Sequence, residues 1–486
     1  MHGLQAGFYT PPGMNVSAAE GEPLIVSVSG LRGVWGGALT TDVAVRYVQA
    51  FVAGLPAGPV VIGRDGRESG PAIAAALTAA LTAGGRDVLD CGVAATPTVG
   101  IVVAEERAAG GIQISASHNP AKYNGLKLFS AAGRVLPAAA GREVLARYEA
   151  AAGAPPHDAA RGRQGSVRQV DGVAPHIRRV MAIVDVAAIR RHRPRVWLDS
   201  CHGAGSRVAV PLFEALGCEL MLEGGEPDGR FEHEPEPTAA NLAGVLPRIP
   251  DCRADVGFFQ DPDADRLAIA TATGRYIGEE STVALAVDAM LAKQAGAIVV
   301  NCSTSGMAAL IAARYGVPCH VSAVGEANVV DRMLATGAVL GGEGNGGVID
   351  PRVVLVRDSF VAMALVLERM CAGSAFESVE RLAAMLPQLV MKKTKVDLAP
   401  ELRGPALGDA LERIGAAFPE ARADRLDGLR LEWAGGWLLV RSSNTEPIVR
   451  IVAEAADETA VDAAIARATA ALVGSPPLMS SPGRAR

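Results

Sequence analysis

The sequence predicts an α/β fold built mainly from parallel strands, followed by a smaller α+β region. Short apolar runs rich in valine and isoleucine precede glycine-containing turns, and alanine- and leucine-rich stretches that end in glycine follow them, as in strand–turn–helix units. Such units begin at "PVVIG" (59–63), "RVWLDSCHGAG" (195–205) and "AIVVNCSTSG" (297–306). Two strands around a Gly-Gly turn in "LRLEWAGGWLLVRSS" (429–443), with a helix after them, indicate the α+β region.

The length of 486 residues is typical of about three or four domains, and we expect four. "AAGAPPHDAARGRQGSVR" (151–168) lacks periodicity and is typical of a linker or long loop, and a weaker break follows Leu386. The units show no clear residue-level repeat. We expect a disordered tail over 1–22, domains over 23–168, 169–274, 275–388 and 389–474, and a second disordered tail over 475–486.

The composition is that of an ordinary globular protein, with 49% hydrophobic and 20% charged residues. A formal net charge of -6 argues against a dedicated nucleic-acid binder, which carries a basic face. The sequence shows no signal peptide and no apolar run near the ~18 residues that span a bilayer. The seven cysteines form no C-x-x-C pair. We therefore expect a reduced, cytoplasmic protein without nucleic-acid or membrane partners.

A serine stands beside a histidine in "GIQISASHNPAKYNGLKLF" (111–129), as Ser117 and His118. An α/β hydrolase would place its nucleophile in G-x-S-x-G, but Ser115 and Asn119 occupy the two glycine positions here. His118, next in sequence, is expected to point away from Ser117. A hydrolase triad is therefore not favoured. The other interpretation from this stretch alone is that Ser117 caps a turn.

Three aspartates alternate in "FFQDPDADRLAIA" (258–270), between two apolar runs. Carboxylates this close repel one another unless a cation neutralises them, and oxygen ligands suit Mg²⁺ or Ca²⁺. The EF-hand interpretation fails, because its sixth position is Arg266 and its twelfth is Ala272. We predict a metal site at Asp261, Asp263 and Asp265, with open positions for a phosphate oxygen.

Two further loops carry polar side chains. "WLLVRSSNTEPIVRI" (437–451) is either an ordinary hairpin loop or a phosphate pocket, whose ligands would be Arg441, Ser443, Asn444, Thr445 and Arg450. "GGEGNGGVID" (341–350) lacks the Lys-Ser/Thr of a nucleotide-binding loop. Its Glu343 and Asn345 would suit the vicinal hydroxyls of a sugar, although glycine-rich turns are common.

These four loops, in this order and at these separations, resemble those of the α-D-phosphohexomutase family, which includes phosphoglucomutase, phosphomannomutase and phosphoglucosamine mutase. The resemblance covers all but the two tails, and further segments match: "VSGLRG" (28–33), "VIGRDGRESG" (61–70), "GVAATPTVG" (92–100), "FEHEPEPTAANL" (231–242) and "RDS" (357–359). It implies three related α/β domains with mixed, mostly parallel sheets and a smaller C-terminal α+β domain, arranged around a central cleft.

The resemblance also implies an isomerase that moves a phosphoryl group between the 1- and 6-positions of a hexose through a 1,6-bisphosphate. Ser117 would be the phosphoserine, Mg²⁺ would bind Asp261, Asp263 and Asp265, and a hexose 1,6-bisphosphate would be the activator. Lys127 would be a general acid or base with a pKa lowered by neighbouring cations.

The remaining roles follow from the same resemblance. Arg32 and Arg266 would add positive charge, Arg266 also facing the sugar, and His118 would shape the loop. Glu343 and Asn345 would hold sugar hydroxyls. The non-reacting phosphate would be bound by Arg441, Ser443, Asn444, Thr445 and Arg450, and the fourth domain would close over the ligand.

One departure bears on the sugar. Many phosphogluco- and phosphomannomutases read G-E-M-S-G-H in the sugar loop, whereas this chain reads G-E-G-N-G-G, with Gly347 in place of histidine. The variant resembles archaeal-type loops assigned to phosphoglucosamine mutases, so we expect glucosamine 6-phosphate as substrate. Glucose and mannose phosphates are the alternatives. A phosphatase or a non-catalytic phosphosugar-binding protein is a more distant one.

Overall fold

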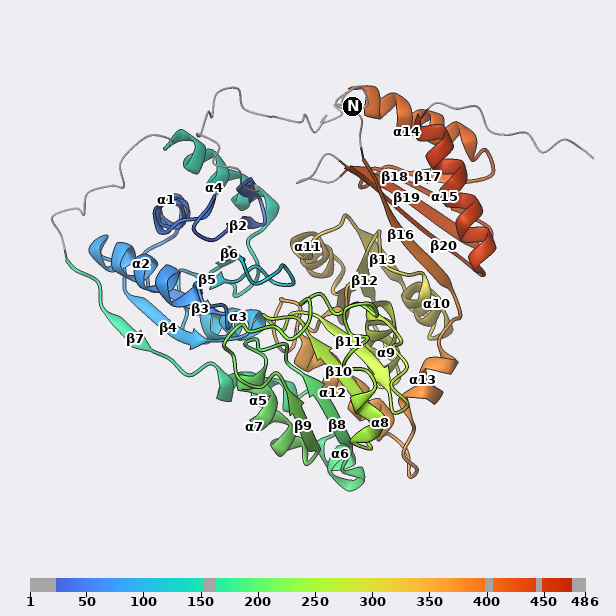
Figure 1. The fold of residues 1–486 in the computed structure, drawn as a ribbon, viewed down its shortest axis with the longest axis horizontal. Helices are drawn as coiled ribbons and strands as arrows, with labels where there is room; N and C mark the ends of the chain where they lie inside the picture. Colours follow the sequence, from blue (N-terminus) through green and yellow to red (C-terminus); the bar gives the residue numbers. More distant parts are fainter. Residues whose placement is uncertain (1–22, 152–162, 398–404, 443–447, 474–486) are drawn as a thin grey trace, which may run out of the picture. The chain divides into compact units, whose positions relative to one another are not determined.

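The structure, a computed structural model, describes residues 23–151, 163–397, 405–442 and 448–473. The chain divides into two compact units, Glu22–Pro387 and Gln388–Arg486, which we describe separately. Three sheets in the first unit and one in the second confirm the expected fold class (Figure 1). The expected tails lie outside the described residues. Among the helices of the described segments, none is long and apolar enough to cross a membrane.

The first sheet has seven strands in the order β1-β2-β6-β5-β3-β4-β7. Its strands are β1 (Ile25–Ser27), β2 (Gly30–Val34), β3 (Val60–Arg64), β4 (Val88–Val93), β5 (Gly110–Ile114), β6 (Tyr123–Ser130) and β7 (Val167–Gln169). The helices of this region are α1 (Thr41–Val52), α2 (Gly70–Ala83), α3 (Thr96–Glu105) and α4 (Ala138–Ala150). The expected domain boundary between residues 168 and 169 falls inside β7.

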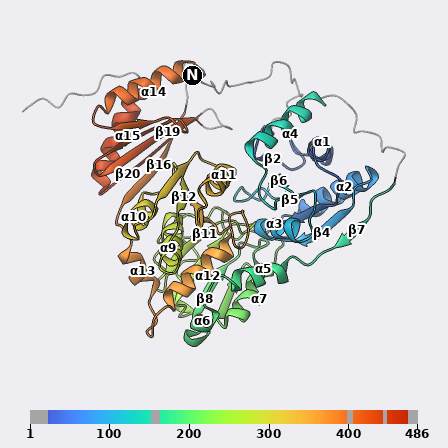
Figure 2. The same cartoon turned by 180° about the vertical axis from the view of Figure 1, so that it is seen from behind.

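Helices cover both faces of the first sheet, as the two views in Figures 1 and 2 show. Successive side chains of a strand point to opposite faces. Val60 and Ile62 of β3 pack in a cluster with buried residues of α1, α2 and α4, whereas Val61 packs in the cluster that includes α3. Because both faces are buried, the strand is a continuous apolar run rather than an alternating one.

The second and third sheets have four strands each, in the orders β11-β10-β8-β9 and β13-β12-β14-β15. The second sheet and its helices are β8 (Arg195–Asp199), β9 (Glu219–Glu223), β10 (Val256–Gln260), β11 (Leu267–Thr271), α5 (Val173–Met181), α6 (Val186–His192), α7 (Ser206–Leu216) and α8 (Arg248–Asp251). The third sheet and its helices are β12 (Ile298–Asn301), β13 (Cys319–Ser322), β14 (Leu340–Glu343), β15 (Gly347–Ile349), α9 (Glu279–Leu291), α10 (Met307–Arg314), α11 (Glu326–Thr336), α12 (Ser359–Met370) and α13 (Val379–Met385).

The three sheets share one topology that no residue-level repeat had revealed. A first strand (β3, β8 or β12) has the next strand parallel on one side and the third parallel on the other. A fourth strand runs antiparallel beside the third. Ligands of such sheets bind at the carboxyl ends of the strands, where the strand order reverses. Ser117, Asp261 and Glu343 follow or end the third strand of each sheet.

The end of the first strand is also built alike in all three sheets. Asp65, Asp199 and Asn301 stand at or directly after the last strand residue. Each Oδ1 accepts a hydrogen bond from the backbone N–H two residues later, at 3.0, 2.7 and 2.9 Å respectively. This side-chain turn is a common use of Asp and Asn. It bends the chain sharply beside the loop that follows the third strand.

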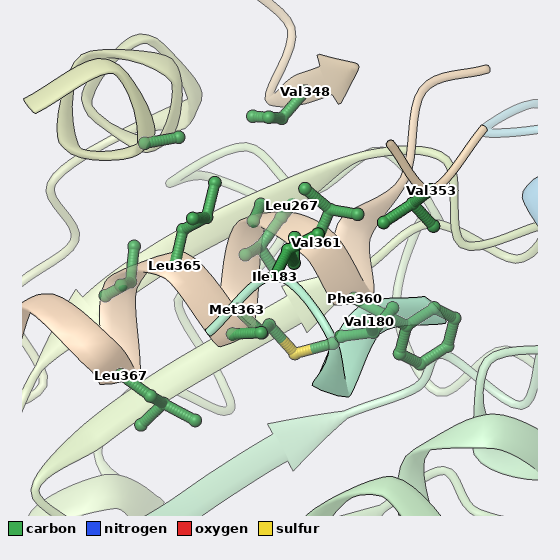
Figure 3. Packing of buried hydrophobic residues seen from close by; sticks show 14 of the residues in the cluster. Val180, Ile183, Leu267, Val348, Val353, Phe360, Val361, Met363, Leu365 and Leu367 are labelled. Atoms are coloured by element: carbon green, nitrogen blue, oxygen red, sulfur yellow. The ribbon is translucent and has the colours of Figure 1, made fainter. Parts of the chain in front are cut away.

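The third sheet's helix α12 lies in the centre of the largest core cluster. Residues 359–367 are all buried, so the helix is apolar on every side, as expected of a central helix. Figure 3 shows its side chains among labelled residues of neighbouring elements: Val180, Ile183, Leu267, Val348 and Val353. Asp358 caps the helix by accepting hydrogen bonds from the backbone N–H groups of Phe360 and Val361.

Asp199, at the end of β8, and the half-buried His233, in the loop after β9, form a pair that predicts a pH-dependent stability. His233 Nε2 lies 2.8 Å from Asp199 Oδ2, and Nδ1 lies 2.8 Å from the Glu234 carbonyl oxygen. Burial lowers the pKa of His233, but the bond to Asp199 and its charge raise it more, so the net shift is upward. The stabilisation is therefore fully present below about pH 6.5 and is lost as the pH rises through the raised folded-state pKa.

We expect His233→Gln to lower the urea midpoint more at about pH 5.5 than at about pH 9. In an Asp199→Asn background most of this difference should disappear, because the partner charge is gone. Equal losses at both pH values would contradict the assignment of the charged pair.

The second unit is a five-stranded antiparallel sheet, in the order β16-β20-β19-β18-β17. Its elements are β16 (Val390–Asp397), α14 (Pro405–Ala417), β17 (Arg422–Asp424), β18 (Leu429–Trp433), β19 (Gly436–Ser442), β20 (Ile448–Ala455) and α15 (Glu458–Val473). Buried residues of α14 and α15 pack with β18, β19 and β20 in one apolar cluster. This is the expected α+β arrangement.

Candidate active site

Ser117 meets the aspartate loop although 144 residues separate them in sequence. Its side chain is buried, and Oγ donates a hydrogen bond of 2.6 Å to Asp261 Oδ2. The backbone of Ser117 is left-handed, with φ of 51°, which costs energy for a residue other than glycine. Its N–H donates to Ser115 Oγ at 2.8 Å. The strained conformation is therefore held by specific contacts.

The expectation that His118 points away from Ser117 is wrong. His118 Nδ1 lies 3.4 Å from Ser117 Oγ, because the left-handed turn at Ser117 brings the two side chains to the same side. The Arg266 charge, burial and the Arg32 charge hold the pKa of His118 well below its usual value. This shift favours the neutral imidazole near pH 7.

The three aspartates form a buried group whose chemistry fits a divalent cation. Asp261, Asp263 and Asp265 each offer a carboxylate oxygen, these atoms lie within 4.8 Å of one another, and all three residues are fully buried. Among the described residues, no group donates a hydrogen bond to Asp263 Oδ1 or Asp265 Oδ1. Buried carboxylate oxygens without donors are costly unless a cation binds them. An all-oxygen set of this kind suits Mg²⁺.

Two aspartates of this loop have pKa values that are shifted in opposite directions. Burial, with the charges of Asp263 and Asp265, raises the pKa of Asp261 well above its usual value. Burial also raises the pKa of Asp265, but Arg357, Lys127 and Arg266 lower it more, so its net pKa is well below the usual value. Arg266 and Lys127 lower the pKa of both carboxylates, and the largest lowering cause for Asp265 is Arg357.

The expectation that neighbouring cations lower the pKa of Lys127 is wrong. Its Nζ lies 2.6 Å from Asp263 Oδ2 and 2.7 Å from Asp265 Oδ2. Burial lowers the pKa of Lys127, but the charges of these two aspartates raise it more, so the net shift is upward. Lys127 lies on β6, opposite Gln113 of β5, and its ammonium contacts carboxylates of the 261–265 loop.

Two arginines add to the positive charge near the serine. Arg32 on β2 donates to Asn119 Oδ1 at 2.8 Å, which connects it to the serine loop. Burial and the charge of Arg266 lower the pKa of Arg32. Arg266 Nε lies 3.8 Å from Asp265 Oδ1. The sequence-predicted residues of the serine and metal loops therefore come together within one unit.

The glycine-rich loop is tied to the metal loop by an arginine to which the sequence assigned no role. Arg357 donates to Asp265 Oδ2 at 2.6 Å and to Glu343 Oε2 at 2.7 Å. Glu343 Oε1 accepts further bonds from Asn301 Nδ2 and the Gly325 N–H. Three of about four acceptor positions of this buried carboxylate are therefore filled, and its orientation is fixed. Asn345, also in this loop, is half-buried.

Arg357 also explains why position 347 is glycine. A Cβ built on Gly347 would lie 2.2 Å from Arg357 Cδ and 2.9 Å from Cγ. The arginine stem therefore occupies the space that a side chain at 347 would need. A histidine at this position, as in many mutases of the resembled family, would require the Arg357 side chain to move.

We expect Gly347→Ala to lower the free energy of unfolding by roughly 1–3 kcal/mol, because Arg357 must move away from Asp265 and Glu343. Urea denaturation would measure this. Gly244→Ala is the matched control, because a Cβ at Gly244 meets no atom within 4 Å. Equal midpoints for the two variants would show that the loop accommodates the extra carbon.

The second unit contains the predicted phosphate loop. Arg441 on β19 and Arg450 on β20 are directly paired across the two strands. Arg441 Nε lies 3.3 Å from Asp427 Oδ2. Ser443, Asn444 and Thr445 lie outside the described residues.

Sequence reasoning missed the roles of three buried polar residues near the site. Thr96 donates its hydroxyl to Asp263 Oδ2 and its N–H to the Asp263 carbonyl. Arg67 contacts the backbone of the serine loop, and Arg357 joins two loops. All three lie in segments that match the family resemblance, "ATPT", "RDGR" and "RDS", so the motifs signalled their importance but not their contacts.

Known families and proteins are similar to the chain over most of its length. Models of the phosphoglucomutase/phosphomannomutase family match it as alpha/beta/alpha domain I (24–154), domain II (174–274), domain III (278–389) and the C-terminal domain (400–471). A phosphoglucomutase/phosphomannomutase of Thermococcus kodakarensis is 35% identical over 439 residues, which cover 88% of this chain and 94% of the relative.

Two further relatives differ in the activity that they are named for. A probable phosphoglucosamine mutase of Methanopyrus kandleri is 32% identical over 432 residues, covering 88% of this chain and 93% of the relative. The crystal structure of a phosphoglucomutase/phosphomannomutase family protein from Burkholderia thailandensis superposes with a TM-score of 0.79 at 28% identity, covering 93% of this chain and 98% of that one.

Proposed function

The chain belongs to the phosphoglucomutase/phosphomannomutase family, and on that premise we propose that it converts glucosamine 6-phosphate into glucosamine 1-phosphate through a phosphoserine at Ser117. The broader activity, that of a phosphohexomutase, follows from the family. The observation that carries the proposal is the 2.6 Å hydrogen bond between Ser117 Oγ and Asp261, inside a buried group of three carboxylates.

In the proposed reaction, the oxygen of a free sugar hydroxyl forms a bond to phosphorus as the P–O bond to Ser117 Oγ breaks, and the proton that the hydroxyl loses is balanced by the proton that Ser117 Oγ gains. The bisphosphate then returns its other phosphoryl group to Ser117. Phosphoryl transfer depends mainly on positioning and on neutralising charge. Arg32, Arg266 and Lys127 supply that charge. Because Asp263 and Asp265 raise the pKa of Lys127, it would enter the cycle as an ammonium, able to protonate a departing oxygen.

We propose that Asp261, Asp263 and Asp265 hold Mg²⁺. Their all-oxygen chemistry supports this, as do the Oδ1 atoms of Asp263 and Asp265, which have no hydrogen-bond partner among the described residues. The ion would supply positive charge to oxygens of the phosphoserine. A hexose 1,6-bisphosphate would act as the activator by phosphorylating Ser117.

The sugar would be held by Glu343 and Asn345, with Arg266 near it. Arg357, Asn301 and Gly325 fix the Glu343 carboxylate. Its remaining acceptor position could therefore bind a sugar hydroxyl without a change in the side chain's orientation. The non-reacting phosphate would bind Arg441, Ser443, Asn444, Thr445 and Arg450. The paired placement of Arg441 and Arg450 supports this assignment.

A second candidate is a phosphoglucomutase or phosphomannomutase. The relative of this name at 35% identity favours it. The glycine at position 347 and the probable phosphoglucosamine mutase at 32% identity favour glucosamine phosphate.

A ³¹P NMR time course with Mg²⁺ and a trace of hexose 1,6-bisphosphate tests the proposal. Glucosamine, glucose and mannose 6-phosphates would be offered separately. We expect the signal of a sugar 1-phosphate to grow fastest with glucosamine 6-phosphate. Faster turnover of glucose or mannose phosphate would favour the second candidate, and release of inorganic phosphate alone would indicate a phosphatase.

A further inference from the structure

Arg67 lies under the serine loop and binds four of its backbone carbonyl groups. It follows β3 in the segment "GRDGRESG", and 1% of its surface is exposed. Its guanidinium donates to the carbonyl oxygens of Ser117 (2.6 Å), Asn119 (2.5 Å), Pro120 (2.7 Å) and Tyr123 (3.0 Å). One planar side chain therefore fixes the direction of four peptide groups in the loop that carries Ser117.

Asp65 fixes Arg67 in turn and neutralises its charge. Arg67 Nε lies 3.1 Å from Asp65 Oδ2, and its N–H donates to Oδ1 at 3.0 Å. Asp65 Oδ2 also accepts the hydroxyl of Ser115, whose own oxygen accepts the N–H of Ser117. Hydrogen bonds thus connect Asp65 to Ser117 in two ways. Arg67 links Asp65 to the carbonyl group of Ser117, and Ser115 links Asp65 to its N–H group.

A loop of the second sheet's domain covers this group from solvent. The Phe231 ring lies 5.0 Å from the Arg67 guanidinium carbon. A Cβ at Gly66 would lie 2.5 Å from the His202 carbonyl oxygen, and one at Gly229 would lie 2.8 Å from Arg67 Cα. The backbones of two domains therefore touch at Arg67, which leaves the arginine little freedom to move.

We propose that Arg67 is a positioning residue for phosphoryl transfer: it turns the carbonyls of the serine loop to one side, so that Ser117 keeps its left-handed backbone and presents Oγ to Asp261. The inference rests on the proposed function of Ser117. Because no described contact joins Arg67 to the sugar loop, loss of its bonds should lower kcat and leave KM nearly unchanged.

The decisive experiment compares Arg67→Lys with Arg86→Lys. Arg86 also donates to four carbonyl groups of one segment in the same domain, those of Val52 at the end of α1 and of Leu55, Pro56 and Gly58 in the loop after it. Lysine keeps the charge but cannot reproduce the planar fork. We expect Arg67→Lys to lower kcat about 10²-fold with KM changed less than about 3-fold. Arg86→Lys should lose thermal stability without loss of kcat.

Hydrogen exchange provides a second measurement that does not depend on turnover. Amides of residues 115–124 should exchange faster in Arg67→Lys than in Arg86→Lys at matched stability. If the wild-type protein turns over no sugar phosphate, the proposed function fails and this exchange alone decides whether Arg67 orders the loop. Wild-type kcat in Arg67→Lys, or equal exchange in the two variants, overturns the proposal.

If Arg67→Lys does not fold, Phe231→Leu tests the positioning role of Arg67 instead. This variant removes the aromatic cover of the guanidinium without deleting any group that hydrogen-bonds Arg67, so the bonds to the serine loop are loosened rather than lost. We expect kcat to fall several-fold with KM unchanged, because the guanidinium gains freedom. An unchanged kcat, or a rise in KM alone, would contradict the positioning role.

Discussion

Replacing Ser117 with alanine should lower hexose phosphate turnover by at least about 10³-fold, because the variant lacks the hydroxyl oxygen that carries the phosphoryl group in the proposed reaction. The variant also removes the donor to the buried Asp261 carboxylate, an effect on stability of about 1–3 kcal/mol. Two measurements separate these effects. Turnover is followed by ³¹P NMR, and incorporation of one phosphoryl group from the bisphosphate is followed by intact mass.

Ser130→Ala is the matched control for this variant. Ser130 ends β6 in the same domain, and its Oγ lies 3.4 Å from the Arg134 carbonyl oxygen, away from the aspartates. We expect this variant to accept the phosphoryl group and to turn over as the wild type does. If Ser117→Ala were still phosphorylated at one residue and active, another side chain would be the carrier.

The fold could be predicted from sequence largely because its local signals agree with one another. In β3, three consecutive apolar residues, Val60, Val61 and Ile62, are buried on both faces, and glycines follow at the turn. Each such unit can be predicted by itself from its own residues. The strand order shared by the three sheets could not be predicted, because it depends on which strands pair. The turns at Asp65, Asp199 and Asn301 gave no signal either, because different residues surround them in each domain.

The site was predictable where the chemistry lies within one loop. Asp261, Asp263 and Asp265 are close in sequence, so their mutual repulsion could be inferred directly. Contacts between different loops could not be predicted in this way. The direction of the Lys127 pKa shift depends on whether carboxylates or guanidinium groups lie nearer to its ammonium, and the packing of the 261–265 loop against β6 decides this.

The contacts of Arg67 and Arg357 also could not be predicted from the sequence. An arginine in a polar segment has the same sequence signature whether it is exposed or buried. Here both are almost fully buried, and each binds groups from loops distant in sequence. Burial of a guanidinium requires partners for its donors, and those partners come from tertiary structure.

Asp263→Asn should weaken the apparent affinity for Mg²⁺ about 10²-fold or more and lower turnover accordingly. The change removes one negative charge from the three carboxylates while keeping an oxygen that can accept from Lys127. The loss of Mg²⁺ affinity can also be measured without turnover, from the melting temperature. A cation at 100 times its dissociation constant stabilises the wild-type fold by about 2.7 kcal/mol, so Mg²⁺ should raise the melting temperature of the wild type and hardly change that of the variant.

Asp255→Asn is the matched control, because Asp255 directly precedes the same strand, β10, and accepts a hydrogen bond from the Arg195 N–H at 2.7 Å. It should lose some stability but keep the full response to Mg²⁺. The comparison separates loss of a carboxylate from loss of a ligand. If Asp263→Asn kept the wild-type response to Mg²⁺, then Asp263 would not be a ligand, and its unpaired Oδ1 would need another explanation. Since Lys127 bonds the other oxygen of Asp263, its ammonium cannot be that explanation.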